Sequence, residues 1–289
     1  MTIAYLNGIF KPIAEAKISP MDRGFLFGDG IYEVIPSYEG KLVGAKLHAE
    51  RMNQGLAEIR IQATGAEYDW ESIALGLIEK NKSAFVDTSI GVYIHVSRGA
   101  DSKRFHAYPA GISPTVFAFA FQIPNPAPAD RHLVKGLRVK THEDLRWSRC
   151  HIKSTSLLGN VMHFQQSQDD GLNETILFNA KKELTEASVC NVFVIKDGVV
   201  ATPPLNNQLL PGITRHILIE SLVRDKKFTV QQRTIILDEL FSADEIWITS
   251  SSKEVAPVIQ IDGKPVGDGR VGAVWEEALT SYHSHKFSF

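Results

Sequence analysis

Hydrophobic residues in the first half of the chain recur with two spacings, one typical of strands and one typical of helices. Apolar runs and alternation predict strands at residues 3–6, 9–13, 90–97 and 115–123, and another beginning near Ile31. Helical spacing predicts helices at 46–59 and 69–79. Loops are predicted at 22–30, where three glycines stand among aromatic residues, and at 105–108. Asn7-Gly8, between two apolar runs, predicts a hairpin turn.

The second half shows the same mixture without regular strand–helix alternation. Strands are predicted at 136–141, 174–178, 189–195, 199–201 and 245–249, and helices at 154–168, 214–225 and 237–241. Asp197-Gly198 and Asp262-Gly263 predict two more hairpin turns. Because no G-x-G-x-x-G follows a strand, the pattern argues against a Rossmann fold.

A proline-rich segment divides the chain. Three prolines fall within five residues at 124–128, which forbids a helix and favours a stiff, extended connection. We therefore expect a small N-terminal domain at 1–123, a linker at 124–130 and a larger C-terminal domain at 131–289.

Composition and charge exclude several classes of protein. A net charge of −2 gives no electrostatic reason to expect a nucleic acid or an anionic membrane as partner. The two cysteines, Cys150 and Cys190, make neither a disulfide framework nor a zinc motif, so no metal is expected. The N-terminus lacks the features of a signal peptide, and the longest apolar run, 116–121, is too short to span a bilayer. These features are typical of a cytoplasmic protein.

Lys153 is the first candidate for chemistry. It lies in Arg149-Cys150-His151-Ile152-Lys153-Ser154-Thr155-Ser156, between an apolar residue and a run of hydroxyls. Partial burial favours the neutral amine, which can form a Schiff base with a carbonyl. Taken alone, the same stretch also fits an ordinary surface lysine before a helix.

Two stretches have the features of a phosphate site. Ile213 and Thr214 follow Pro211-Gly212 at the start of an apolar helix, where free N–H groups attract anions. Ser250 and Ser251 follow an apolar strand and offer hydroxyls and turn amides. Arg51, on a predicted helix, could add a guanidinium. A plain helix cap, a polar loop and a solvated arginine are the alternative interpretations.

Two further sets of side chains could recognise the ends of a substrate or cofactor. Glu186, just before an apolar strand, is either a surface residue or a buried acceptor for a protonated nitrogen. Arg104 and His106, two apart on a loop, are either exposed polar residues or a pair that binds a carboxylate. A lysine, a phosphate cradle, a carboxylate and a carboxylate-binding pair are together what a pyridoxal 5'-phosphate (PLP) enzyme of amino acids needs.

These residues stand in segments that resemble the fold-type IV PLP aminotransferases, and among them the D-amino acid aminotransferases. The likeness runs from Tyr5 to about Gly272. Its segments are Asp22-Arg23-Gly24, Phe27-Gly28-Asp29-Gly30, Tyr32-Glu33-Val34, Arg104-x-His106, Asp144-x-Arg146-Trp147, Arg149-Cys150-x-Ile152-Lys153-Ser154, Thr185-Glu186, Asn191-Val192-Phe193, Gly212-Ile213-Thr214-Arg215 and Thr249-Ser250. The loop at 101–103 departs from the family pattern, and Ser251 replaces a threonine.

The resemblance implies a role for each candidate. Lys153 would hold PLP covalently and then move the proton between the substrate Cα and the cofactor. Glu186 would keep the pyridine nitrogen protonated, and Leu210 would pack on the ring. The phosphate would be held by Arg51, Ile213, Thr214, Ser250 and Ser251. Tyr32, with Arg104 and His106 of a neighbouring subunit, would bind the substrate carboxylate, which implies a homodimer.

The implied fold is α+β, with a small α/β domain and a larger β-barrel-like α/β domain. The implied reaction is ping-pong transamination of D-amino acids such as D-alanine, with 2-oxoglutarate or pyruvate as acceptor. A branched-chain L-aminotransferase, an (R)-amine transaminase and an aminodeoxychorismate lyase share the fold and cofactor and stay open. A non-catalytic protein that binds a phosphate ligand is the alternative outside enzymes.

Overall fold

The computed structural model describes residues 2–63 and 68–289, and their contacts form two compact units. The first unit comprises Met1–Asn125, Ile152–Leu157 and Phe289, and the second comprises Pro126–His151 and Leu158–Ser288. Residues 152–157, which include Lys153, therefore pack with the N-terminal part of the chain, although the sequence places them well beyond the proline-rich segment.

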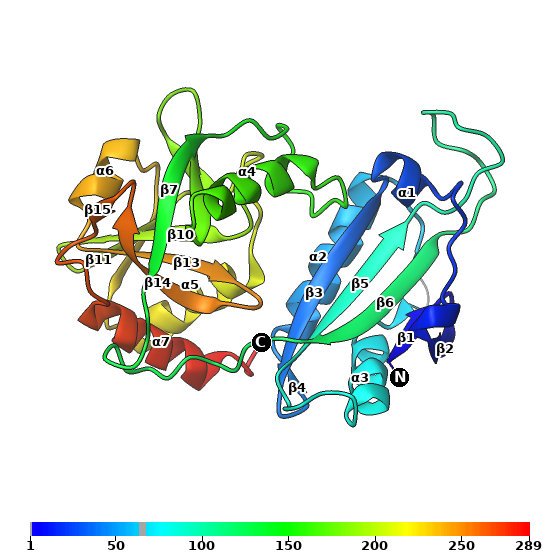
Figure 1. The fold of residues 1–289 in the computed structure, drawn as a ribbon, viewed down its shortest axis with the longest axis horizontal. Helices are drawn as coiled ribbons and strands as arrows, with labels where there is room; N and C mark the ends of the chain where they lie inside the picture. Colours follow the sequence, from blue (N-terminus) through cyan, green and yellow to red (C-terminus); the bar gives the residue numbers. More distant parts are fainter. Residues whose placement is uncertain (1, 64–67) are drawn as a thin grey trace. The chain divides into compact units, whose positions relative to one another are not determined.

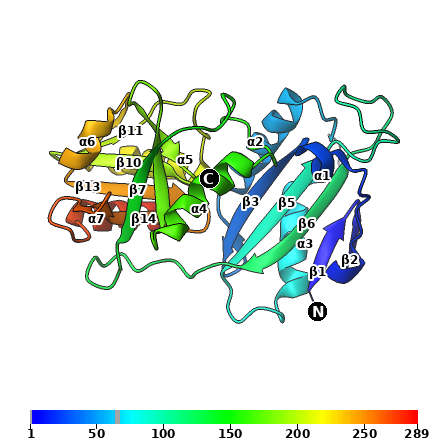
Figure 2. The same cartoon turned by 45° about the horizontal axis from the view of Figure 1, so that its top comes forward.

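The first unit is built on an antiparallel sheet in the order β2-β1-β6-β5-β3-β4. Figure 2 shows β2, β1, β6, β5 and β3 side by side. Their bounds are β1 Ile3–Leu6, β2 Ile9–Pro12, β3 Gly30–Tyr38, β4 Lys41–Leu42, β5 Ile90–Ser97 and β6 Thr115–Gln122.

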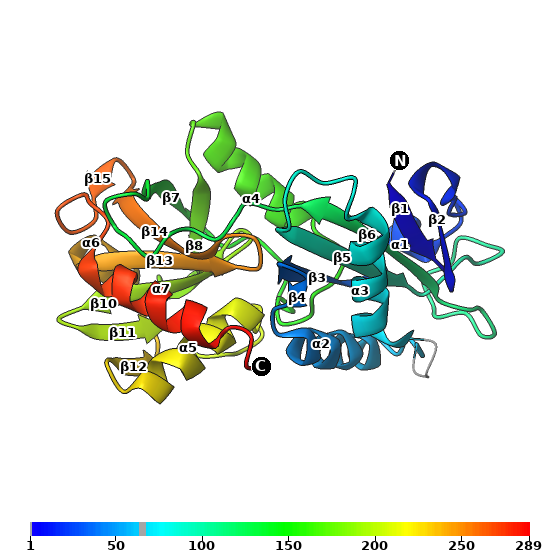
Figure 3. The same ribbon diagram turned by 90° about the horizontal axis from the view of Figure 1, so that it is seen from below.

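Helices α2 (Ala45–Glu58) and α3 (Trp70–Asn81) pack on this sheet, and Figure 3 shows them with β3 to β6. The apolar positions of β3, β5 and β6 alternate, so one face of each strand meets the helices in a common core that includes Ile31, Ile94 and Leu77. The other face carries Tyr93 and three phenylalanines of β6, Phe117, Phe119 and Phe121.

The second unit is built on a mixed nine-stranded sheet in the order β12-β11-β10-β13-β14-β7-β8-β9, with β15 beside β14. Pairs β11–β12, β14–β7 and β7–β8 are parallel. The sheet curls, because β9 at one end also contacts β10. The bounds are β7 Leu137–Glu143, β8 Glu174–Phe178, β9 Leu184–Ala187, β10 Asn191–Lys196, β11 Val199–Thr202, β12 Thr229–Gln232, β13 Glu245–Ser250, β14 Glu254–Ile261 and β15 Lys264–Pro265.

Helices cover this sheet (Figure 1). They are α4 Leu158–Asp169, α5 Ile213–Asp225, α6 Leu237–Ser242 and α7 Ala273–His285. Helices α5 and α7 pack on each other and on β13, whereas α4 packs on β7 and β8. The predicted α+β mixture of helices and strands is thus confirmed.

The three predicted hairpin turns are confirmed, and each places a residue pair in the left-handed region. The φ angles are +47° and +91° at Asn7-Gly8, +49° and +75° at Asp197-Gly198, and +49° and +76° at Asp262-Gly263. Asparagine, aspartate and glycine tolerate this region, which the two-residue turn between right-twisted strands requires.

Two predicted elements are wrong. The helix expected from Ser154 begins at Leu158, because Ser154 instead forms a bridge with Ile31 and Thr155 N–H donates to the Gly30 carbonyl at 3.0 Å. The loop expected at 22–30 contains a short helix, α1 (Arg23–Phe27), which Asp22 caps by accepting from Gly24 N–H at 2.8 Å.

Candidate active site

Lys153 is held beside β3 in the first unit. The Tyr32 N–H donates to the Lys153 carbonyl at 3.1 Å, and Thr155 N–H bonds to Gly30 as described above. The Lys153 amine lies 4.1 Å from the centre of the Tyr32 ring. The structure therefore brings together two of the predicted site residues, the lysine amine and the tyrosine ring.

Arg51 belongs to a buried ionic cluster in the same unit. Its Nε and Nη2 donate to the two carboxylate oxygens of Glu33, both at 2.7 Å, and His48 Nδ1 lies 2.7 Å from Glu33 Oε2. Burial lowers the pKa of His48, and the charges of Arg51 and Lys153 act in the same direction against the opposing effect of Glu33. Burial would raise the pKa of Glu33, but Arg51 and His48 hold it well below its ordinary value.

Glu33 is a residue that the sequence interpretation missed. The signal was present, because Glu33 occupies the core-facing phase of β3 between Ile31 and Ile35. An acid at such a position must have a buried partner. Arg51, expected as a phosphate ligand, is that partner, and its phosphate role stays a prediction.

Arg104 and His106 lie on an exposed loop of the first unit. The Arg104 guanidinium lies 5.1 Å from the centre of the Phe27 ring, and the His106 ring lies 5.2 Å from the same ring. Phe27 thus brings these two predicted residues together. Tyr32, the third member of the predicted carboxylate site, contacts Lys153 instead.

Glu186 lies on β9 in the second unit and is buried. Its Oε1 accepts from Arg146 Nη1 at 2.6 Å, and its Oε2 accepts from Asn191 Nδ2 and Leu210 N–H, both at 3.1 Å. Burial raises the pKa of Glu186 to about 7, which the charge and hydrogen bond of Arg146 only partly oppose. Such a carboxyl group is suited to a partner that brings its own positive charge or proton.

Arg146 is in turn fixed by Asp144. Its Nε and Nη2 donate to Asp144 Oδ1 at 3.0 Å and Oδ2 at 2.8 Å, and Thr185 Oγ1 donates to Asp144 Oδ2 at 2.8 Å. Asp144 and Arg146 therefore support Glu186, a role that the sequence alone did not assign.

The start of α5 is shaped by Asn191. A Cβ atom at Gly212 would lie 2.0 Å from Asn191 Oδ1, so a larger residue there would displace Asn191, whose Nδ2 donates to the Leu210 carbonyl at 2.8 Å. Gly212 is the N-cap residue and makes no side-chain bond, so the first amides of the helix, at Ile213 and Thr214, are not capped. Free amides at a helix N-terminus suit a phosphate.

The turn after β13 carries the remaining predicted phosphate residues. Ser250 and Ser251 are partly exposed, and Ser250 Oγ accepts from Lys253 N–H at 3.2 Å. The hydroxyl of Thr249, next to them, is buried without a hydrogen-bond partner among the described residues. The uncapped amides, the orphaned hydroxyl and a carboxyl group of raised pKa are all compatible with PLP.

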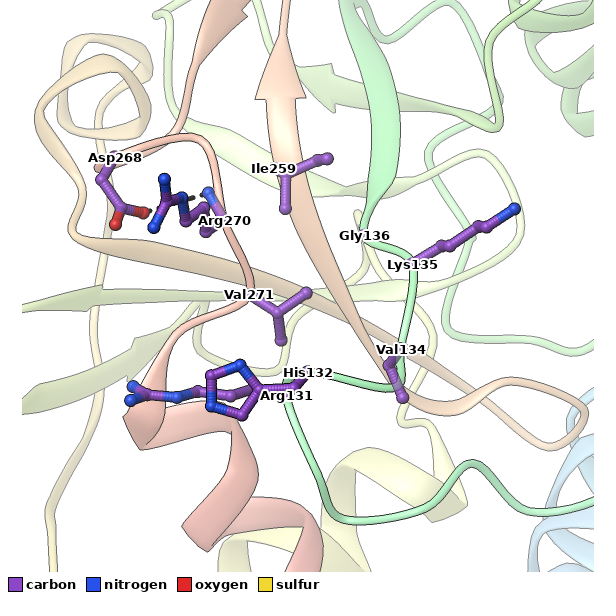
Figure 4. A pocket seen from close by; sticks show the side chains of 9 residues that line it. All are labelled: Arg131, His132, Val134, Lys135, Gly136, Ile259, Asp268, Arg270 and Val271. Atoms are coloured by element: carbon purple, nitrogen blue, oxygen red, sulfur yellow. Dashed lines mark hydrogen bonds between the residues drawn. The ribbon is translucent and has the colours of Figure 1, made fainter.

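A separate cavity of about 560 Å³ opens on the second unit. Figure 4 shows Ile259 and Val271 at its centre, with Arg131, His132 and Arg270 around them. None of the predicted site residues lines it, so it is not part of the candidate active site.

With this fold and these residues, comparisons with known proteins identify the class. The family model described as amino-transferase class IV matches residues 30–261. A D-alanine aminotransferase of Staphylococcus aureus (strain MSSA476) is 36% identical over 282 residues, which cover 97% of this chain and 96% of that protein. The chain belongs to the class IV aminotransferases.

Solved structures agree on the fold. A branched-chain amino acid aminotransferase of Escherichia coli has a TM-score of 0.88 and 23% identity, covering 99% of this chain and 94% of that one. A hypothetical aminotransferase of Mycobacterium tuberculosis, described as PLP-bound, has a TM-score of 0.85 and 17% identity, covering 99% of each chain. The fold is thus the two-domain α+β fold of fold-type IV enzymes. The chain is an aminotransferase that depends on PLP.

Proposed function

We propose that this aminotransferase transfers the amino group of D-amino acids, such as D-alanine, to 2-oxoglutarate or pyruvate by a ping-pong mechanism. The observation that carries the proposal is the match, over nearly the whole chain, to a protein named D-alanine aminotransferase. The pair Arg104 and His106 supports it, because an arginine fork and a second donor suit an α-carboxylate.

Lys153 is proposed as the catalytic residue. PLP, when bound, supplies an electron sink for the substrate Cα. Lys153 would hold the cofactor through its amine, and after the substrate has replaced it the freed amine would take the proton from Cα. Its place 4.1 Å from the Tyr32 ring keeps the amine beside a side chain whose hydroxyl is proposed to bind the substrate carboxylate.

Glu186 is proposed to pair with the protonated ring nitrogen of the cofactor. Its three hydrogen bonds, from Arg146, Asn191 and Leu210, fix the carboxyl group in one orientation. Leu210 is proposed to pack on the ring. The phosphate would be bound by Arg51, Ile213, Thr214, Ser250 and Ser251.

We also propose a homodimer in which Arg104 and His106 of one subunit bind the substrate carboxylate in the site of the other. Within one chain both side chains lie on Phe27, whereas Tyr32 lies against Lys153. The aromatic face of the first unit, formed by Tyr93, Phe117, Phe119 and Phe121, has the composition of a protein interface.

Cytoplasmic location is proposed from the two free cysteines. No helix in the described part of the chain is both long and apolar enough to cross a membrane.

A substrate panel tests the proposal. The purified protein would be assayed with D-alanine, L-leucine and (R)-1-phenylethylamine, each with 2-oxoglutarate and with pyruvate. We expect the highest kcat/KM for D-alanine. A preference for L-leucine would instead indicate a branched-chain L-aminotransferase, the class to which the similar E. coli structure belongs. A preference for the amine, or pyruvate release from aminodeoxychorismate, would indicate one of the other two alternatives.

A further inference from the structure

Beneath the loop that carries Arg104 and His106 lies a group of three charged residues, Arg23, Asp29 and Arg98, of which the two arginines are buried. We infer that these three residues, together with Tyr108, position the loop so that it can bind the substrate carboxylate. The inference rests on the proposed function of Arg104 and His106, and it adds residues that hold them in place rather than touch the substrate.

Two arginines share one carboxylate in this group. Asp29 Oδ2 accepts from Arg23 Nε and from Arg98 Nε, both at 2.8 Å, and Asp29 Oδ1 accepts from Arg98 Nη2 at 2.9 Å. The side chains of both arginines are less than one tenth exposed. Burial would raise the pKa of Asp29, but the two arginines hold it below its ordinary value. The group of three residues therefore carries one net positive charge.

Backbone carbonyls satisfy the guanidinium donors that Asp29 does not reach. Arg98 donates to the carbonyls of Ile59 at 2.7 Å and Arg60 at 3.1 Å, which anchors it on the end of α2. Arg23 donates to two carbonyls of the loop itself, through Nη1 to Phe105 and through Nη2 to His106 at 3.2 Å. A buried cation would lose these partners if the loop moved away, so the loop is held by a charge-assisted contact.

Tyr108 provides the second attachment of the loop. Its ring centre lies 3.6 Å from the Arg98 guanidinium, which is a close cation–π contact, although the ring is 52% exposed. Arg23 and Arg98 thus hold the loop at residues 105–106 and 108. Because the loop backbone is the part that is fixed, the side chains of Arg104 and His106 project from a defined support.

A comparison of variants tests this inference. Tyr108→Ala removes the surface attachment with little risk to folding, and Arg23→Met removes the buried one. Phe241→Ala is the matched control, because it removes a partly exposed ring under Lys264, at 5.1 Å, in the second unit. For each variant, KM for D-alanine, the inhibition constant of acetate, kcat and the dissociation constant of PLP would be measured. Arg104→Ala is included to test the proposed carboxylate site itself.

We expect KM and the acetate inhibition constant to rise together, about threefold to tenfold for Tyr108→Ala and more than tenfold for Arg23→Met, since a cation–π contact is weaker than charge-assisted hydrogen bonds. The PLP dissociation constant and kcat of these two variants should change less than about twofold. All four constants of the control variant Phe241→Ala should also change less than about twofold. If Arg104→Ala raises KM but Tyr108→Ala does not, the inference is wrong and the proposed function stands. If Arg104→Ala has no effect, the proposed carboxylate site is wrong. If Arg23→Met does not fold, Tyr108→Ala decides.

Discussion

At the scale of single residues, the proposed site contains a carboxyl group that burial makes costly to ionise. Glu186 is buried, and its raised pKa means that the folded, cofactor-free protein holds a proton which the unfolded chain releases between about pH 4.5 and 7. Because the folded state binds more protons in that range, the free energy of unfolding falls as the pH rises. The contribution of Glu186 protonation to the free energy of unfolding is fully present below about pH 4.5 and is lost as the pH rises through 7.

We therefore predict that Glu186→Gln removes this component of the pH dependence. In urea unfolding of the cofactor-free protein, the stability difference between variant and wild type should shift in favour of the variant by about 3 kcal/mol between mildly acidic and mildly alkaline pH. Glutamine keeps an oxygen for Arg146 while removing the titration. Parallel stability curves for the two proteins would show that Glu186 does not titrate in this range.

The sequence singles out candidate residues that stand in motifs, but it does not show which residues support them. Lys153 and Glu186 stand in segments with a recognisable order of residue types. Glu33 and Arg146 are far in sequence from the residues they bind, Arg51 and Glu186, and the spacing of those pairs follows from the packing of strands and helices. The charges alone do not reveal which residues pair with each other.

At the scale of elements, a buried ion pair connects the end of helix α7 to the residue that follows the turn of Ser250 and Ser251. Glu254, which follows that turn with a φ of +51°, is buried. Its carboxylate lies 2.6 Å from Lys286 Nζ and 2.7 Å from His283 Nε2. Burial would raise the pKa of Glu254, but His283 and Lys286 hold it below its ordinary value.

Lys286→Met is predicted to destabilise the protein by about 3 kcal/mol, because it removes the lysine charge from the buried Glu254 carboxylate and leaves it with the His283 ring. Lys196→Met is the matched control. It breaks a pair with Asp244 at 2.8 Å in which both side chains are about half exposed, so it should destabilise the protein much less than Lys286→Met. Urea unfolding of both variants measures the difference. Equal losses would mean that burial of the Glu254 pair has no energetic consequence.

Elements with local signals were predictable, and those without were not. The Asn-Gly and Asp-Gly turns fix backbone angles locally, so three hairpins followed from dipeptides. The start of α4 could not be predicted from a local signal, because residues 152–157 form long-range hydrogen bonds to β3 that outweigh their helical spacing. Strand β14 and helix α7 were also absent from the sequence interpretation.

At the scale of the whole molecule, the proposed homodimer makes a prediction about mixed subunits. Lys153→Ala and Arg104→Ala would each impair D-alanine turnover when pure. If Arg104 acts in the site of the other subunit, a mixed dimer contains one site with both native residues. Random re-association of equal amounts should then restore about a quarter of wild-type activity. No recovery in verified mixed dimers would place Arg104 and Lys153 in the same subunit's site.

The most direct test of the account is reduction of the purified, PLP-loaded protein with borohydride, followed by digestion and mass spectrometry. We predict a yellow protein that loses its colour and carries the reduced cofactor on Lys153 alone, with Lys153→Ala unlabelled and inactive toward D-alanine. A label on another lysine, or undiminished transamination by Lys153→Ala, would contradict the assignment of Lys153 as the catalytic amine.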